Sequence, residues 1–356
     1  MTTSLSNAYK DTNIHLNNII PLDFGSVLQL PESHVWTDDD DSGQDRRGRV
    51  RTCLVRADAA ASPPVIDLRA PDSAGLAGEA CRRWGVFQVT NHEVPRDLVE
   101  DVEAHARRLF QLPADRKLRA LRASNGVTGY GVARISPFFP KSMWHEGFTI
   151  MGSAMEHAKL LWPHHYQEFC DAMDKYQKKM KALAYKILLV ILKALGVDEE
   201  DHDKLASSFL YQSDGALQLN SYPSCPNPSR AIGLAPHTDS LLLTILHQND
   251  TDGLQIMQEG VGWVPIRPTP GALVVNIGDL MHILSNATFH NMYHRVVPNK
   301  TSHRFTMAYF YGPPADSVLA PLPKLPGPPR FRAITVKEYI GIKNKHLEKA
   351  LSFIQT

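Results

Sequence analysis

Apolar residues in the first half of the chain recur mostly at helical spacing. The strongest stripe covers residues 165–195, where apolar side chains return every three or four positions. Weaker stripes predict helices over residues 96–111 and 71–84. Short strands are predicted at 65–68 and at 85–90, where β-branched residues alternate with others. The first half is therefore expected to be mainly helical, with a few strands.

The pattern of apolar and polar residues changes after about residue 215, where short apolar runs alternate with turn residues. Many short strands at close spacing indicate an all-β sandwich or barrel. The runs cover residues 217–222, 231–237, 241–246, 254–257, 262–266, 272–277, 296–297 and 305–311. Residues 335–353 predict a closing helix, whereas residues 120–160 show no clear period. Long irregular segments of that kind are often functional.

These patterns predict an α+β protein with a mainly β core. We expect four parts along the chain. They are an irregular N-terminal extension (1–60), a mostly helical region (61–205), a β-rich domain (206–335) and a C-terminal helix (336–356).

Composition narrows the possible partners. The 356 residues are 43% hydrophobic and 21% charged, with a formal net charge of +1. Near-zero charge gives no electrostatic reason to expect nucleic acid or an anionic membrane as a partner. The acidic run at 38–41 and the arginines of 46–51 roughly cancel, and we interpret them as a solvated loop.

The cysteines and the N-terminus indicate a cytoplasmic protein. Cys53, Cys81, Cys170 and Cys225 are widely spaced, which favours free thiols in a reducing compartment. The N-terminus lacks a basic segment followed by an apolar one, so no secretory signal is predicted. No run of about 20 apolar residues predicts a membrane span.

His237-Thr238-Asp239 is the first motif that suggests chemistry. On a strand or at its end, residues two apart point to the same side, so this imidazole and carboxylate can reach one metal ion. The motif is short and arises readily by chance, so it needs a third ligand to be convincing.

We predict that His294 supplies the third ligand. Two histidines and one carboxylate form the facial triad of non-haem Fe(II) oxygenases, which leaves coordination sites for a bidentate co-substrate and O₂. His247, His282 and His290 are the rival histidines, and His290 is the most serious competitor.

Arg304 and Thr306 form a second constellation, ten residues further on. On a strand the two side chains share a face, and an arginine fork beside a hydroxyl suits a buried carboxylate. Tyr222 could add a second hydroxyl to the same carboxylate. The alternative is an exposed arginine beside an ordinary strand hydroxyl.

Taken together, these residues resemble the plant 2-oxoglutarate- and Fe(II)-dependent dioxygenases over about residues 64–340. The motifs that carry the resemblance are 85–92 (GVFQVTNH), 220–223 (NSYP), 237–240 (HTDS), 278–279 (GD), 294–296 (HRV) and Arg304 with Thr306. The resemblance implies a double-stranded β-helix (jelly roll) flanked by helices, with a helical or mixed N-terminal region.

The same resemblance implies the roles of individual residues. His237, Asp239 and His294 would bind Fe(II), while Arg304, Thr306 and Tyr222 would bind 2-oxoglutarate. O₂ is the other co-substrate, and ascorbate is expected to stimulate turnover. The implied reaction releases succinate and CO₂ and hydroxylates the substrate through a ferryl-oxo intermediate.

A finer resemblance is to the gibberellin 3β-hydroxylases. It rests on residues 129–131, 136–139, 143–149, 278–284 and 309–314. It implies 3β-hydroxylation of a small diterpenoid acid, a C19 gibberellin precursor, with no obligate protein partner and a cytoplasmic, or also nuclear, location. The candidate substrate contacts are Tyr130, Ser136, Met143, Trp144 and Phe148; the alternative for Met143, Trp144 and Phe148 is core packing.

Four positions depart from the family pattern. They are Glu93 and Ala287 in place of glycine, His145 in place of serine, and Thr306 in place of serine. If the family's glycine at this position has positive φ, its replacement by glutamate is costly, so we expect a different local turn at Glu93.

These departures leave the regiospecificity open, and other functions stay as alternatives. They are oxidation at the 2- or 20-position of gibberellins, a flavonoid substrate, a jelly-roll binding protein without turnover, or, more weakly, a zinc hydrolase.

Overall fold

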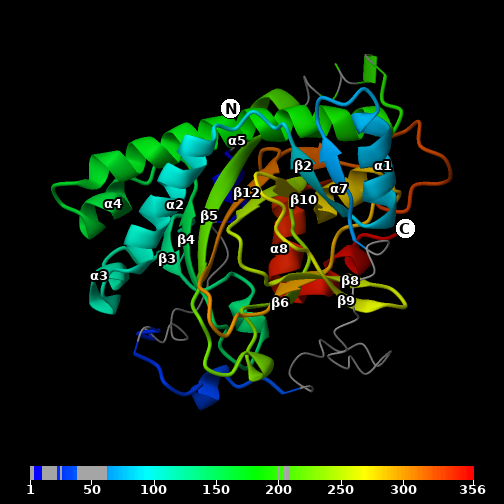
Figure 1. Ribbon diagram of the computed structural model, residues 1–356. Coiled ribbons are helices and arrows are strands. Elements are labelled where there is room, and N and C mark those ends of the chain that lie inside the picture. Colours follow the sequence, from blue (N-terminus) through cyan, green and yellow to red (C-terminus); the bar gives the residue numbers. More distant parts are fainter. Residues whose placement is uncertain are drawn as a thin grey trace.

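A computed structural model describes most of the chain (Figure 1). It covers residues 4–9, 22–24, 26–37, 62–124, 126–198, 200–201, 203, 205 and 209–356. The charged runs at 38–51 and Cys53 lie outside the described residues, as does most of the predicted N-terminal extension. No described helix is both long enough and apolar enough to cross a membrane.

Two sheets form the centre of the molecule. The larger has the order β1-β2-β10-β7-β12-β5-β4-β3, and the smaller has the order β6-β11-β8-β9. The larger sheet's strands are β1 (Val65–Asp67), β2 (Val86–Thr90), β3 (Gly129–Gly131), β4 (Glu146–Ile150), β5 (Asp214–Tyr222), β7 (Leu243–Gln248), β10 (Leu273–Ile277) and β12 (Arg304–Gly312). The smaller sheet's strands are β6 (Leu234–His237), β8 (Leu254–Gln258), β9 (Gly262–Pro265) and β11 (His294–Val296). Strands β13 (Val318–Leu319) and β14 (Ile334–Thr335) form a separate pair.

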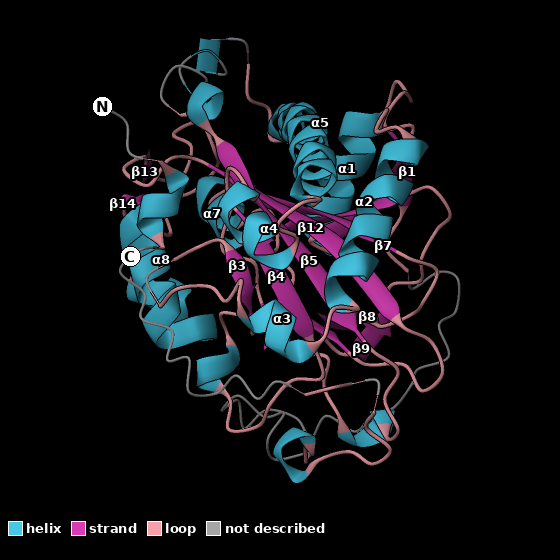
Figure 2. Cartoon of the chain, turned by 90° about the vertical axis from the view of Figure 1, so that its left-hand side faces the viewer, coloured by secondary structure: helices cyan, strands magenta, loops and turns pink. Residues whose placement is uncertain are grey.

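Helices cover the larger sheet on one side, and the closing helix lies on the other (Figure 2). The covering helices are α1 (Ser73–Arg83), α2 (Arg96–Phe110) and α5 (Tyr166–Ala194). Shorter helices are α3 (Ala114–Leu118), α4 (Met155–Leu161) and α7 (Asp279–Leu284), and the closing helix is α8 (Val336–His346). A short 3₁₀ helix near the N-terminus, η1 (Leu5–Ala8), contacts α8.

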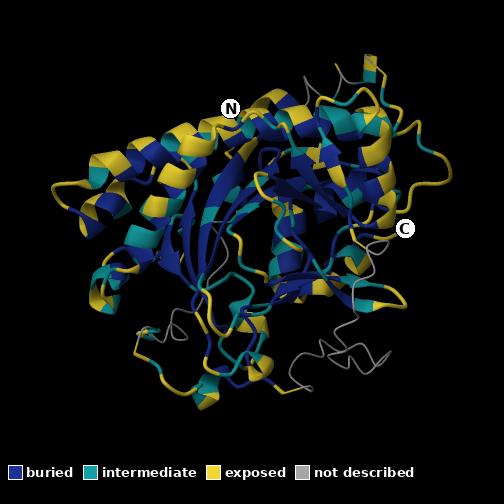
Figure 3. Cartoon of the chain, viewed as in Figure 1, coloured by how far each residue is buried: buried dark blue, intermediate teal, exposed yellow. Residues whose placement is uncertain are grey.

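Alternation along each strand separates the core from the interior cavity. On β12, Phe305, Met307 and Tyr309 belong to the core shared with α5 and α2, whereas Thr306 and Ala308 line a cavity. Successive strand residues point to opposite faces, which produces this division. The strands are buried, while the helices expose their outer faces (Figure 3).

The predicted α+β class and jelly-roll core are confirmed, and most predicted elements occur within a few residues of their expected bounds. The prediction missed α3, α7 and the β13–β14 pair. In the stretch without a clear period it also missed β3, β4 and α4. The sequence of β4 is Glu-Gly-Phe-Thr-Ile, whose buried glutamate and threonine disguise a central strand. The closing helix ends as an α-helix at His346, because Leu347 has φ 44° and a 3₁₀ helix follows.

The turn after β2 adopts the glycine-type conformation despite its side chain. Glu93 has φ 64°, and Ala287 has φ 63° at the other position where glycine was expected. The expectation of a different turn at residue 93 is therefore wrong. The rest of the fold outweighs the local strain, which is of order 1–3 kcal/mol for a non-glycine residue in this region.

Candidate active site

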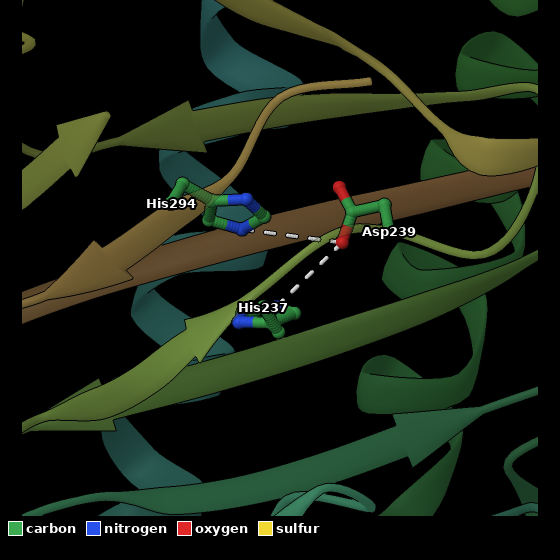
Figure 4. Close-up of side chains that lie close together, drawn as sticks. All are labelled: His237, Asp239 and His294. Carbon is green, nitrogen blue, oxygen red and sulfur yellow. Dashed lines mark ion pairs between the residues drawn. The ribbon is translucent and has the colours of Figure 1, made fainter. Parts of the chain in front are cut away.

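The pairing of β6 with β11 brings two distant histidines together. His294, the first residue of β11, lies directly opposite His237, the last residue of β6. Their ring centroids are 4.2 Å apart. Asp239 follows β6 by two residues and points at both rings (Figure 4). Antiparallel pairing thus assembles the three side chains, all of which are buried.

The spacing of the three side chains suits one metal ion. Asp239 Oδ1 lies 3.7 Å from His237 Nε2 and 4.0 Å from His294 Nε2. One potential ligand atom from each residue lies within 4.8 Å of the other two. Within the described part of the chain this is the one group of three or more such residues that could hold a metal.

Backbone carbonyls orient both imidazoles. His237 Nδ1 lies 2.8 Å from the Ala235 carbonyl oxygen, and His294 Nδ1 lies 3.2 Å from that of Met292. A carbonyl only accepts, so each Nδ1 carries the proton and each Nε2 lone pair faces Asp239. Fixing the tautomer through the other ring nitrogen is the usual support for a metal-binding histidine.

Burial also keeps His237 neutral. Desolvation, with a smaller contribution from the neighbouring His294, lowers the pKa of His237 to about 3. The imidazole is therefore unprotonated at neutral pH, which is the form that coordinates a metal. Asn276 Nδ2 is 3.4 Å from Asp239 Oδ2 and supports the carboxylate from β10.

Arg304 provides a buried positive charge in the same interior space. Only 1% of its surface is exposed, and burial lowers its pKa to about 10, so it stays charged at neutral pH. Nη2 donates to Gln248 Oε1 at 2.8 Å, but Nε and Nη1 have no hydrogen-bond partner among the described residues. A buried guanidinium with unsatisfied N–H groups fits an anionic ligand, because an uncompensated buried charge is costly.

Strand register places the other two predicted residues beside Arg304. Tyr222 on β5 lies directly opposite Arg304 on β12, and its ring centroid is 5.3 Å from the guanidinium carbon. Thr306 lies opposite Asn220, whose Nδ2 donates to Thr306 Oγ1 at 3.1 Å. The structure therefore brings Arg304, Thr306 and Tyr222 together on one wall of the cavity.

One cavity of about 200 Å³ contains both constellations. It lies between the two sheets and is lined by residues of β4, β5, β7, β10 and β12 from the larger sheet and of β6, β8 and β11 from the smaller. Apolar contributions come from Ile135, from Phe138 of the short 3₁₀ helix Ser136–Phe138, and from Leu347 after α8. The metal ligands and the buried arginine can therefore act on molecules bound in the same space.

The five candidate substrate residues lie outside the central cavity, and their role in substrate binding stays a prediction. None of them lines the central cavity: Tyr130, Ser136 and Met143 line a second cavity, while Trp144 and Phe148 are fully buried.

Strand alternation explains the place of Phe148. Thr149 on β4 faces the central cavity, so its neighbour Phe148 faces the opposite core and meets Phe169 there. Trp144 donates its Nε1–H to the Pro223 carbonyl and packs against Phe24.

The rival histidines His247 and His282 bond to residues other than the proposed metal ligands. His247 Nε2 lies 3.3 Å from Glu103 Oε2 of α2, and His282 Nδ1 lies 2.7 Å from the Phe289 carbonyl. His290 is exposed.

Lys343 lines the cavity from α8 and was not among the predicted site residues. A signal was available, since Val336, Tyr339, Ile340 and Lys343 form one buried stripe and a lysine on such a stripe needs a partner.

Comparison with known proteins agrees with the fold and the site. Residues 213–313 match the 2OG-Fe(II) oxygenase superfamily, and residues 63–169 match the N-terminal family described as non-haem dioxygenase in morphine synthesis. The chain is thus a member of the 2OG-Fe(II) oxygenases.

Full-length relatives narrow this class. Gibberellin 3-beta-dioxygenase 1 of Pisum sativum is 47% identical, covering 99% of this chain and 94% of its own length. Gibberellin 3-beta-dioxygenase 1 of Arabidopsis thaliana is 45% identical, covering 100% and 99%. The chain belongs to the gibberellin 3-beta-dioxygenase family.

Solved structures share the architecture. JOX2, crystallised in complex with 2OG, Fe and JA, has a TM-score of 0.76 at 26% identity and covers 98% of this chain and 99% of its own. Fe(II) and 2-oxoglutarate are therefore the cofactor and co-substrate of this protein. The residues present fit both, because the donor set suits iron and the unsatisfied Arg304 suits a carboxylate.

Proposed function

We propose that the protein catalyses Fe(II)- and 2-oxoglutarate-dependent 3β-hydroxylation of C19 gibberellin precursors, with release of succinate and CO₂. The observation that carries the proposal is the single cavity that joins His237, Asp239 and His294 to the buried Arg304. The full-length relatives that share 45–47% identity and are named gibberellin 3-beta-dioxygenases support the substrate and position.

In this proposal His237, Asp239 and His294 hold the iron. When bound, iron supplies the oxygen activation that protein side chains lack. The chain contributes two neutral imidazoles with fixed tautomers and one carboxylate, all on one face, so the opposite face stays open to ligands.

Arg304, Thr306 and Tyr222 bind the distal carboxylate of 2-oxoglutarate. The Nε and Nη1 atoms of Arg304 have no hydrogen-bond partner among the described residues, so the guanidinium keeps N–H groups that can donate to this carboxylate. The hydroxyls of Thr306 and Tyr222 lie on the same wall and complete the subsite. These side chains would orient the co-substrate and leave its 2-oxo acid end available to the metal.

The gibberellin occupies the part of the cavity that lies beyond the co-substrate. Apolar residues there suit a hydrocarbon cage, and they include Val127, Ile135, Phe138 and Met151. Arg134 follows β3, which is three strands from β12 and so roughly 14 Å from it at ordinary strand spacing. We assign the substrate carboxylate to Arg134, since it lines the same cavity and belongs to the segment after β3 rather than to the strands that hold Arg304, Thr306 and Tyr222.

The N-terminal 3₁₀ helix and α8 help to exclude water. Tyr9 lines the cavity directly after η1, and Arg134 lies 5.1 Å from the centre of its ring. Leu5 and Ala8 are buried in the core, and η1 contacts α8. A closed, dry cavity strengthens the charge interactions within it and protects reactive species from side reactions.

We also propose that the protein acts in the cytoplasm, with the nucleus as a second compartment, and without an obligate protein partner. The cysteines support a reducing compartment, since Cys81, Cys170 and Cys225 are buried free thiols.

The test is mass spectrometry of C19 gibberellins incubated with the purified protein, Fe(II), 2-oxoglutarate, ascorbate and air. We expect a 3β-hydroxylated product together with an equal amount of succinate. Oxidation at another carbon would overturn the assigned position, and turnover of a flavonoid alone would overturn the substrate class. Absence of succinate with every substrate would overturn the catalytic proposal.

A further inference from the structure

His145 adjoins the residues proposed to bind the co-substrate, since it contacts Tyr222 and Asn220. It lies just before β4 and is 7% exposed. Burial lowers its pKa to about 4, so the ring is neutral at neutral pH. None of the chemistry proposed above uses this histidine, although its side chain lines the central cavity.

A hydrogen-bond chain links His145 to Thr306. Its Nε2 lies 2.9 Å from Asn220 Oδ1, which also accepts from Gln218 Nε2 at 3.1 Å. The oxygen accepts from both, so His145 carries its proton on Nε2. Asn220 then donates through Nδ2 to Thr306 Oγ1. His145 thereby fixes the orientation of the Asn220 amide and, through it, the lone pairs and the proton of the Thr306 hydroxyl.

A ring contact links His145 to Tyr222. The ring centroids are 5.0 Å apart with an interplanar angle of 40°. The Arg304 guanidinium carbon lies 5.3 Å from the centre of the same tyrosine ring. Tyr222 is thus held by an imidazole and a guanidinium together, which restricts its rotamer.

His145 also forms part of the wall between two cavities. The second cavity, of about 250 Å³, lies beneath the described N-terminal residues Phe24, Ser33 and His34. His145 and Ala133 line both cavities. A smaller side chain at position 145 would leave space continuous with the second cavity, so water could reach the subsite.

From these contacts we infer that His145 is a positioning residue for the 2-oxoglutarate subsite: it orders Tyr222 and Thr306 and shields the bound distal carboxylate from the second cavity. The inference rests on the proposed function, in which Arg304, Thr306 and Tyr222 bind that carboxylate. His145 does not touch the reacting atoms, and its effect is on affinity for the co-substrate.

The experiment compares two 2-oxo acids by calorimetric titration of anaerobic Fe(II)-loaded protein. 2-Oxoglutarate has the distal carboxylate, whereas 2-oxobutyrate keeps the chelating end and lacks it. His145→Ser should weaken 2-oxoglutarate binding about tenfold, as expected for the loss of a hydrogen bond and a ring contact, and should leave 2-oxobutyrate binding unchanged. His145→Gln can keep the hydrogen bond to Asn220, and His145→Phe can keep the ring contact with Tyr222. Each of these variants should show a smaller loss of 2-oxoglutarate affinity than His145→Ser.

His303→Ser is the matched control. The His303 ring bonds to Ser221 Oγ at 2.9 Å and stacks on the Phe305 ring with centroids 4.0 Å apart. Ser221 on β5 and Phe305 on β12 alternate with the residues of those strands that line the cavity. This variant loses similar contacts, and both acids should bind as in the wild type.

The outcomes separate the two proposals. Equal weakening of both acids in all three His145 variants, or no weakening of either, would overturn the role of His145. Failure of the wild-type protein to bind 2-oxoglutarate more tightly than 2-oxobutyrate would instead overturn the proposed carboxylate subsite.

Discussion

The ammonium of Lys343 lies 2.6 Å from the carboxylate of Asp279, and both side chains are buried. Tyr339 and Asn291 donate to the same carboxylate at 2.6 and 2.7 Å. Lys343 also donates to the hydroxyl of Thr238, the residue between two of the proposed metal ligands. The closing helix is therefore joined to α7 by a buried ion pair and to the turn between His237 and Asp239 by a hydrogen bond.

Replacing Lys343 by methionine should lower the free energy of unfolding by about 3–5 kcal/mol, because it leaves a buried carboxylate without its counter-charge. Urea unfolding of the metal-free protein measures this. The Lys343 ammonium holds the pKa of Asp279 below its usual value, so the pair stabilises above the unfolded pKa of about 4 and its contribution is lost as the pH falls. The deficit should accordingly shrink in acid.

Two control variants sharpen that experiment. Lys345 is exposed on the same helix, so Lys345→Met should leave stability unchanged. The double variant Lys343→Met with Asp279→Asn should recover part of the loss. A single variant as stable as the wild type would show that the ion pair contributes little.

Asp239→Asn should abolish Fe(II) binding and turnover while preserving the folded metal-free protein. The substitution removes the charged ligand but keeps the side-chain size, so we expect the metal-free fold to be retained. Calorimetric titration with Fe(II) and urea unfolding provide the two readouts. His290→Ala, at an exposed rival histidine, should bind iron normally. Loss of iron binding in that control would point to another ligand set.

Arg304→Lys should raise the KM for 2-oxoglutarate at least tenfold and change the KM for the gibberellin little. A lysine supplies a point charge in place of the guanidinium fork. Steady-state kinetics with each substrate varied in turn measures the split. Arg267→Lys, on the exposed surface, is the control. An effect confined to the gibberellin KM would contradict the role of Arg304.

Arg134→Met should raise the KM for the gibberellin about tenfold without changing that for 2-oxoglutarate, given that hydrogen bonds to charged groups contribute about 1.5–3 kcal/mol. The methyl ester of the gibberellin provides a chemical control. Wild-type enzyme should bind the ester about as weakly as the variant binds the acid. If Arg134→Met weakens the ester as much as the acid, the arginine does not meet the carboxylate.

Glu93→Gly should raise the free energy of unfolding by about 1 kcal/mol. Glycine relieves the strain of the positive φ, and the greater backbone entropy of glycine in the unfolded chain offsets part of that gain. Its ion pairs with Arg69 (3.9 Å) and Lys186 (3.4 Å) are exposed and contribute little. Glu93→Ala is the matched control, because it removes the ion pairs but keeps Cβ, so only the glycine variant should gain. Thermal or urea unfolding distinguishes them, and equal behaviour of the two variants would rule out strain.

Local patterns in the sequence were sufficient to predict much of this protein. The stripe of α5, the alternation along β5 and β12, and the motif at His237 and Asp239 depend on neighbouring residues and on the fixed periods of helix and strand. The prediction that His294 joins His237 and Asp239 as the third metal ligand rested on the whole set of motifs rather than on neighbouring residues. Its geometric reason, the register of β11 against β6, is a contact between distant segments.

Other features depend on the tertiary structure alone. β4 was hidden because its polar residues are satisfied by distant partners: Glu146 by Lys117 and Tyr130, and Thr149 by Arg122 and Gln218.

By itself, the sequence determined the chemistry, because residue types set which ligands and charges are available. The tertiary structure decided which side chains share the cavity. It turned Phe148 toward the core and placed Lys343 and His145 beside the site, because burial and strand register depend on packing between segments far apart in the chain.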